Sequence, residues 1–195
     1  MKTGANPDEG KLRMYLGIDI GTSGVKAVIC DEAQTVVAQA SSPLTVNRPH
    51  PLWSEQDPSS WWKATDDAVQ KLDPKLRAAV RAIGLSGQMH GATCLDQDDK
   101  IIRPAILWND GRSGGSCAQM MAELPELIDI AGNLAMPGFT APKLHWMRSA
   151  EPENFKRVAK VLLPKDYVRL LMSGDYSSDM SDSAGTLWMN VAKRD

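Results

Sequence analysis

The first stretch of the sequence that could do chemistry is GIDIGTSGVK, residues 17–26. An apolar strand ends there at a carboxylate, Asp19, and a tight turn follows. Glycines, hydroxyls and a lysine make up the turn and the residues after it: Gly21, Thr22, Ser23, Gly24 and Lys26. Glycine allows the backbone to approach a ligand closely, and consecutive N–H groups in such a turn form an anion-binding concavity. The stretch therefore predicts a phosphate-binding turn.

Asp19 adds a possible metal ligand to this turn. A carboxylate beside a phosphate is favourable only with a cation between them, and Mg²⁺ is held by carboxylates together with phosphate oxygens. We therefore expect Asp19 to bind Mg²⁺, directly or through water. A plain β-hairpin turn without a ligand is the alternative, and the spacing alone does not decide. The stretch is neither a Walker A loop nor a GxGxxG fingerprint.

The elements around the turn are predicted from periodicity. Strands are expected at 15–19, 24–30 and 36–40, and their short connections require antiparallel neighbours. After a proline-marked loop at 41–56, Asp57-Pro58 begins a helix with a buried stripe. A further strand is expected at 80–85, which ends in SGQMHG.

The second half of the chain is predicted to be mostly helical. Helices are expected at 116–124, 127–131, 142–149 and 164–172, and strands at 92–95 and 158–163. In the 142–149 helix, Leu144 with Met147 or Trp146 is expected to form the buried side. The pattern indicates an α/β protein.

Composition excludes several partner classes. The formal net charge is −2, which gives no reason to expect nucleic acid or an anionic membrane surface as partner. The sequence has no apolar run long enough to span a membrane. Three separated cysteines, without CxxC spacing, favour a reducing cytoplasm. Residues 1–13 have the composition of a polar leader, expected to be flexible or foreign to the folded part.

Six further segments carry a resemblance to a known family. In chain order they are RPHPLWSEQDPSSWW, LSGQMHGATCLD, RPAILWNDGR, GNLAMPGFTAPKLHW, LLPKDYVRL and SDMSDSAGTLW. Together with DIGTSGVK they resemble the FGGY family of carbohydrate kinases, from residue 14 to residue 195. The resemblance implies a ribonuclease-H-like α/β domain of the actin and sugar-kinase ATPase type. Its mixed sheet would have antiparallel first three strands and flanking helices.

The resemblance implies ATP-dependent phosphorylation of D-xylulose to D-xylulose 5-phosphate. ATP and Mg²⁺ would be the cofactors, the sugar the small-molecule partner, and a homodimer the candidate assembly. Asp19 would act on the phosphoryl side, through Mg²⁺, and the glycine turn would bind the ATP phosphates. The sugar would be contacted by residues of two segments: Met89, His90, Trp108, Asn109, Asp110 and Arg112. Such side chains offer donors and acceptors for hydroxyls and apolar surface for the sugar carbons.

Other interpretations remain for these residues. A histidine after a strand is often a satisfied loop residue, and NDGR is a good turn whose charges could form a local ion pair. A sister kinase for ribulose, fuculose, rhamnulose, gluconate or glycerol shares most of the motifs. A truncated, non-catalytic sugar-binding domain is the alternative from another class.

The length predicts an incomplete enzyme. In the family, the aspartate that acts as catalytic base and the second domain lie beyond the point that corresponds to Asp195. We therefore expect 14–195 to be an incomplete N-terminal domain without the C-terminal domain. Phosphoryl transfer depends on positioning the γ-phosphate, so the isolated chain is expected to be inactive.

Overall fold

The computed structural model describes residues 13–195, so all but Arg13 of the predicted leader lies outside the described residues. A four-stranded sheet in the order β3-β2-β1-β5 forms its centre. The strands are β1 (Met14–Ile20), β2 (Gly24–Cys30), β3 (Val36–Pro43) and β5 (Val80–Gly87). The first three are antiparallel neighbours, and β5 returns parallel to β1. The predicted mixed sheet is confirmed.

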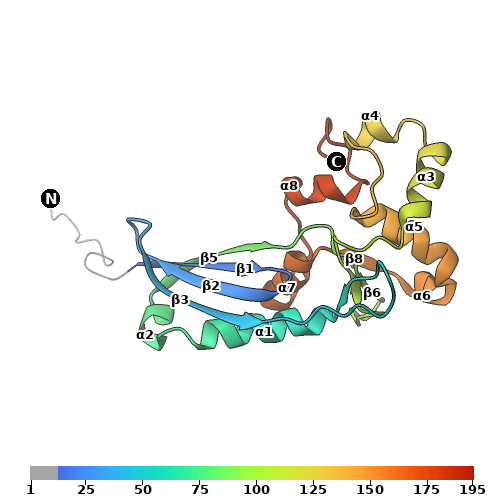
Figure 1. Cartoon of the computed structure of the whole chain (residues 1–195). Helices are drawn as coiled ribbons and strands as arrows, with labels where there is room; N and C mark the ends of the chain where they lie inside the picture. Colours follow the sequence, from blue (N-terminus) through green and yellow to red (C-terminus); the bar gives the residue numbers. More distant parts are fainter. Residues whose placement is uncertain (1–12) are drawn as a thin grey trace.

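Alternation along β1 gives the sheet two different faces. Leu16, Ile18 and Ile20 are buried, whereas Gly17 and Asp19 between them are exposed. The buried side chains pack against α1 (Pro58–Gln70), and Figure 1 shows α1 and α2 (Pro74–Ala78) lying along one side of the sheet. Asp57 caps α1 by accepting a hydrogen bond from the Ser59 backbone N–H at 2.9 Å. The face that carries Asp19 therefore stays open.

Two short sheets connect the central sheet to the helices. β4 (Glu55–Gln56) pairs with β7 (Ala105–Ile106), and β6 (Thr93–Leu95) pairs with β8 (Lys160–Leu162), both antiparallel. The expectation that 41–56 is all loop is wrong, because β3 extends to Pro43 and β4 forms at the end of this segment. The partner of β4 lies about fifty residues away, so local sequence carries no signal for it.

The remaining helices form a group beyond the end of the strands. They are α3 (Gly114–Glu123), α4 (Leu127–Ala131), α5 (Thr140–Ala150), α6 (Pro152–Arg157) and α8 (Met180–Ser183), with a 3₁₀ turn at Ala184–Thr186. Figure 1 shows α3, α4 and α8 above the plane of the sheet and α6 near its level, whereas α7 (Pro164–Ser173) lies beside β5. None of the helices within 13–195 is long and apolar enough to cross a membrane.

Helix α5 differs from its prediction in a way that matters for the site. It begins at Thr140, two residues before the predicted start. Met147 is buried as expected, but Leu144 is only half-buried, and Lys143 is 0% exposed. A lysine in an apolar segment is normally assigned to the solvent side, and for that reason the predicted buried side contained Leu144 in place of Lys143.

Candidate functional site

The glycine turn lies at the end of the open sheet face. Asp19 pairs with Lys26 on β2 and with Ser86 on β5, so these side chains share one face. A shallow hollow of about 350 Å³ on this face is lined by residues of all three strands, including these three. The predicted carboxylate and the predicted lysine are therefore cross-strand neighbours over an open surface.

The turn itself is tightly closed. The Gly21 N–H donates to the Gly24 carbonyl at 3.0 Å. A Cβ on Gly24 would lie 2.8 Å from the Ser42 carbonyl oxygen, so glycine is required there. Among the described residues, the backbone N–H groups of Thr22 and Ser23 have no hydrogen-bond partner. Free N–H groups in a turn are what an anion-binding concavity requires.

Thr22 joins the turn to both predicted sugar segments. Its hydroxyl donates to the Gln88 side-chain oxygen at 3.1 Å and accepts from the Trp108 indole N–H at 3.0 Å. Gln88 in turn donates to Gln56 at 2.8 Å, and Gln56 donates to the Thr22 carbonyl at 2.7 Å. Trp61 in the core donates to the same Gln56 oxygen at 2.9 Å. This closed network fixes the turn relative to the 88–90 and 108 segments.

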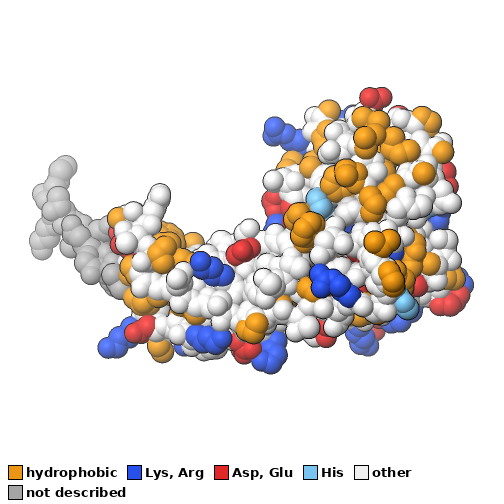
Figure 2. Space-filling model, in the orientation of Figure 1, with side chains coloured by type: hydrophobic (Ala, Val, Ile, Leu, Met, Phe, Trp, Pro, Cys, Tyr) orange, Lys and Arg blue, Asp and Glu red, His pale blue; other side chains and the backbone are white. Residues whose placement is uncertain are grey.

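Met89 and His90 line a second hollow next to the first. It has a volume of about 570 Å³ and shares Leu85 and Ser86 with the hollow at Asp19. Figure 2 shows the concave bend of the molecular surface where the flat sheet meets the helical group. The two hollows therefore form one continuous surface on which a phosphate and a sugar could lie side by side.

His90 is held in an unusual conformation. Its φ is +63°, in the left-handed region, which a residue with a side chain rarely adopts. The imidazole packs edge-on against Phe139, with ring centroids 4.8 Å apart. Gly185 covers the ring so closely that an added Cβ would lie 2.1 Å from the ring Cε1. Burial, reinforced by the charge of Lys143, lowers the pKa of His90, so the neutral ring is favoured.

Met89, Trp108 and Asn109 remain accessible to a ligand. Met89 and Trp108 are each 40% exposed, which is high for large apolar side chains, and Asn109, next to Trp108 in the chain, is also exposed. The lining of the hollow at Met89 and His90 includes neither Trp108 nor Asn109. Because the Trp108 indole N–H is bonded to Thr22, the ring has a fixed orientation. These residues can offer apolar surface and an amide to a sugar.

Asp110 and Arg112 are placed differently. Their side chains are 0% and 1% exposed, and the Arg112 Nη2 lies 2.7 Å from the Asp110 carboxylate. Asp110 also accepts from the Ser54 N–H at 2.5 Å, and Arg112 pairs with Glu55 at 2.7 Å. The guanidinium stacks on Trp53, 3.6 Å from the ring centroid. The carboxylate and the guanidinium thus have internal partners, as the ion-pair interpretation of NDGR anticipates.

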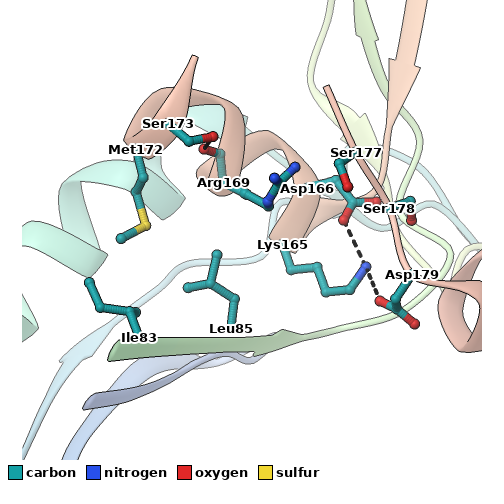
Figure 3. A pocket seen from close by; sticks show the side chains of 10 residues that line it. All are labelled: Ile83, Leu85, Lys165, Asp166, Arg169, Met172, Ser173, Ser177, Ser178 and Asp179. Carbon is teal, nitrogen blue, oxygen red and sulfur yellow. Dashed lines mark hydrogen bonds and ion pairs between the residues drawn. The ribbon is translucent and has the colours of Figure 1, made fainter. Parts of the chain in front are cut away.

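A third hollow continues from the second between β5 and α7. It has a volume of about 370 Å³, and Figure 3 shows Ile83 and Leu85 on one side and Met172 and Arg169 on the other. Lys165 at its end contacts Asp166 at 2.8 Å, Asp179 at 3.0 Å and Asp182 at 2.8 Å.

This ion cluster holds α8 against the start of α7. Burial lowers the pKa of the Lys165 amine, but hydrogen bonds to Asp166, Asp182 and Asp179 outweigh it and keep the pKa above its usual value. Lys165 therefore stays charged. It fixes the 179–182 segment as a wall of the hollow that contains His90.

Sequence reasoning missed several polar residues that organise the site. Gln56, Gln88 and Lys165 were not predicted, although Gln88 directly precedes Met89. Their only sequence signal is a polar residue at the edge of an apolar run, which is common on surfaces.

A Mg²⁺ ion at this site would need coordinating oxygens from a bound phosphate and from water, in addition to those of the protein. Within residues 13–195 no group of three or more His, Cys, Asp or Glu side chains could hold a metal. Asp19 is a single, exposed carboxylate on the open face. Mg²⁺ in phosphate sites needs only one or two protein carboxylates, because phosphate oxygens and waters complete its shell. The residues present therefore fit such an ion.

Comparison with known proteins places this geometry in a family. Residues 14–195 match the N-terminal domain of the FGGY family of carbohydrate kinases. The chain belongs to that family. The predicted family resemblance, including its extent along the chain, is confirmed.

Among members of this family, the chain is similar to several named sugar kinases. Xylulose kinase of Escherichia coli strain K12 is 58% identical over 183 residues, which cover 93% of this chain and 38% of the relative. The crystal structure of a xylulose kinase from Brucella ovis is 55% identical, with a TM-score of 0.91 over 93% of this chain and 39% of that one. A gluconate kinase from Lactobacillus acidophilus has a TM-score of 0.84 at 25% identity, over 92% and 37%. The chain thus spans well under half the length of these relatives.

Proposed function

We propose that the chain is the N-terminal part of an ATP-dependent kinase that converts D-xylulose to D-xylulose 5-phosphate. The observation that carries the proposal is the hydrogen-bond link from Thr22 to Gln88 and Trp108. It joins a turn with free N–H groups to the segment that holds Met89 and His90. The high identity to relatives named xylulose kinases supports the choice of sugar.

The glycine turn and its neighbours would serve the nucleotide. The free N–H groups of Thr22 and Ser23 would bind phosphate oxygens, and Gly21 and Gly24 allow the close approach. Lys26 adds a positive charge on the same sheet face. Asp19 would hold Mg²⁺, which when bound neutralises charge on the phosphates.

The second hollow would serve the sugar. Met89 and Trp108 would cover the carbon face of the sugar, while His90 and Asn109 would exchange hydrogen bonds with its hydroxyls. Asp110 and Arg112 would shape the pocket from behind, because they hold the loop that carries Trp108 and Asn109. The cytoplasm as compartment and a homodimer as assembly belong to the same proposal.

A substrate panel with the full-length product of the gene tests this function. ADP release is measured with D-xylulose, ribulose, fuculose, rhamnulose, gluconate and glycerol at equal concentrations. We expect the largest kcat/KM for xylulose, and a His90→Ala variant should lose most of it. A larger kcat/KM for another sugar would assign the chain to a sister kinase. Unchanged xylulose kinetics in His90→Ala would remove His90 from the sugar site.

A non-catalytic sugar-binding domain is the second candidate, because the hollow lined by Met89 and His90 could bind a sugar without phosphoryl transfer. Calorimetry on the chain of 195 residues, with xylulose and with Mg·ATP, separates the two. Turnover by this chain alone is expected to be undetectable. Sugar binding that is insensitive to nucleotide, together with an inactive full-length product, would favour the second candidate.

A further inference from the structure

Lys143 is a buried amine directly behind the proposed sugar site. It lies on helix α5, and its side chain is fully buried. The Nζ donates to the carbonyl oxygens of His90 at 2.6 Å and of Gly138 at 2.8 Å. Burial of a lysine is unfavourable unless its N–H groups are paired. Here two backbone carbonyls pair them, one from the distant His90 segment and one from Gly138, five residues before Lys143 in the chain.

The first of these carbonyls belongs to His90, whose backbone is in the left-handed conformation. A backbone outlier of this kind persists only where its surroundings hold it. Thr140, one turn earlier on α5, donates its hydroxyl to the same His90 carbonyl at 3.2 Å. Helix α5 therefore supplies two donors to the peptide group that sets the direction of the imidazole.

The second carbonyl belongs to a segment that supports Trp108. A Cβ on Gly138 would lie 2.7 Å from the Trp108 carbonyl oxygen, so these backbones are in direct contact. Phe139, the next residue, packs on the His90 ring. A single side chain thus ties the His90 segment and the support of Trp108 to one helix.

The chemistry of the amine suits this position. Burial lowers the pKa of Lys143 to about 7, with the charge of Asp110 opposing the shift and that of Arg112 adding to it. A neutral amine has two N–H groups, which match the two carbonyl acceptors. The neutral side chain is therefore fully paired, whereas a charged ammonium would bring a third N–H beyond these two acceptors.

We propose that Lys143 is a positioning residue of the sugar site, which fixes the His90 and Trp108 segments relative to each other without contacting the sugar. This rests on the proposed function of the second hollow as the sugar site. Loss of Lys143 should then weaken sugar binding more than nucleotide binding, because among residues 13–195 its hydrogen bonds go to His90 and Gly138 and none goes directly to the glycine turn.

The test uses a Lys143→Met variant of the full-length gene product, since methionine has a similar length but no donor. Removal of both hydrogen bonds is expected to raise the KM for xylulose about tenfold or more, with the KM for ATP within about twofold. Met147→Ala is the matched control. It creates a cavity on the same helix at a residue that is 1% exposed, and it should lower the melting temperature without changing the KM for xylulose.

Two outcomes of this kinetic test would overturn the proposal. One is a KM for xylulose in Lys143→Met that stays within about twofold of the wild-type value. The other is an equal rise of that KM in Met147→Ala. If Lys143→Met does not fold, Thr140→Val takes its place. It removes the second donor to the His90 carbonyl and should raise the same KM by a smaller factor, and an unchanged value would contradict the proposal.

Titration of the His90 imidazole by NMR gives a readout that needs no sugar. Because the charge of Lys143 lowers the pKa of His90, Lys143→Met should raise that pKa and shift the ring resonances, while Met147→Ala should not. Unchanged resonances and pKa would overturn the positioning role. If the wild type phosphorylates no sugar in the panel, the proposed function fails. The His90 ring resonances in Thr140→Val, which removes a donor to the same carbonyl without removing a charge, then decide whether α5 positions His90, and unchanged resonances there would contradict it.

Discussion

The glycine turn and the NDGR loop differ in what their polar groups contact. Both are short polar segments after apolar runs, and both contribute predicted site residues. In the turn, Asp19, Ser23 and Lys26 are exposed. In the loop, Asp110 and Arg112 are enclosed by Ser54, Glu55 and Trp53.

This comparison shows that burial separates the polar residues of a motif into two kinds, those that can bind a ligand and those that stabilise the protein. A buried charge must be paired within the protein, so the groups of Asp110 and Arg112 are used internally. An exposed N–H or carboxylate stays available to a ligand. One loop contains both kinds of residue. Its exposed residues are Trp108 and Asn109, which stay available to a ligand, and its buried residues are Asp110 and Arg112, which are paired within the protein.

The largest expected effect comes from Arg112→Met. It leaves the Asp110 carboxylate buried without its partner, and loss of one member of a buried ion pair costs about 3–5 kcal/mol of unfolding free energy. Urea unfolding of the wild type and the variant measures the loss. Asn109→Ala, an exposed change in the same loop, should stay within about 0.5 kcal/mol. A loss below about 1 kcal/mol in Arg112→Met would mean that the ion pair does not hold the loop.

The pH dependence of stability is the next largest effect. The pKa of Lys143 falls from 10.5 to about 7 on folding, so between these values the unfolded chain binds the extra proton. The contribution of Lys143 to the free energy of unfolding therefore increases as the pH rises from 7 and decreases as the pH falls back towards 7. The gain is about 1.4 kcal/mol per pH unit.

Denaturant unfolding from pH 7 to pH 8.5 measures this slope. Lys143→Met serves as the comparison, because every other titrating group is common to both proteins. The wild type should gain stability relative to the variant as the pH rises. Parallel curves would show that Lys143 keeps its ordinary pKa.

A smaller effect is expected at the link between turn and loop. Thr22→Val leaves the Trp108 indole N–H and the Gln88 amide without their shared partner, at a cost of about 1–2 kcal/mol. Ser23→Ala, next to it and exposed, should cost less than about 0.5 kcal/mol. Equal losses in the two variants would mean that the Thr22 hydroxyl does not join the segments.

The sequence was most informative where structure is local. The first three strands could be predicted because alternation and short connections decide their pairing. The strand at Glu55–Gln56 could not, because its partner at Ala105–Ile106 is distant. The candidate site residues came from motifs and family resemblance.

The buried polar residues were the least predictable. Lys143 lies in a helix where an apolar stripe was expected at Leu144, and Gln88 precedes the predicted pair without belonging to it. Their positions follow from backbone carbonyls and amides supplied by other segments. Such long-range pairing is invisible to periodicity.

The central claim is that the open turn serves phosphoryl transfer and the buried loop serves structure. Asp19→Asn in the full-length gene product tests it most directly, because Asp19 is exposed and its loss should leave the unfolding free energy unchanged within about 0.5 kcal/mol. We predict that kcat for xylulose phosphorylation falls by about a hundredfold or more in this variant. A kcat within about twofold of the wild-type value, in an equally stable protein, would contradict it.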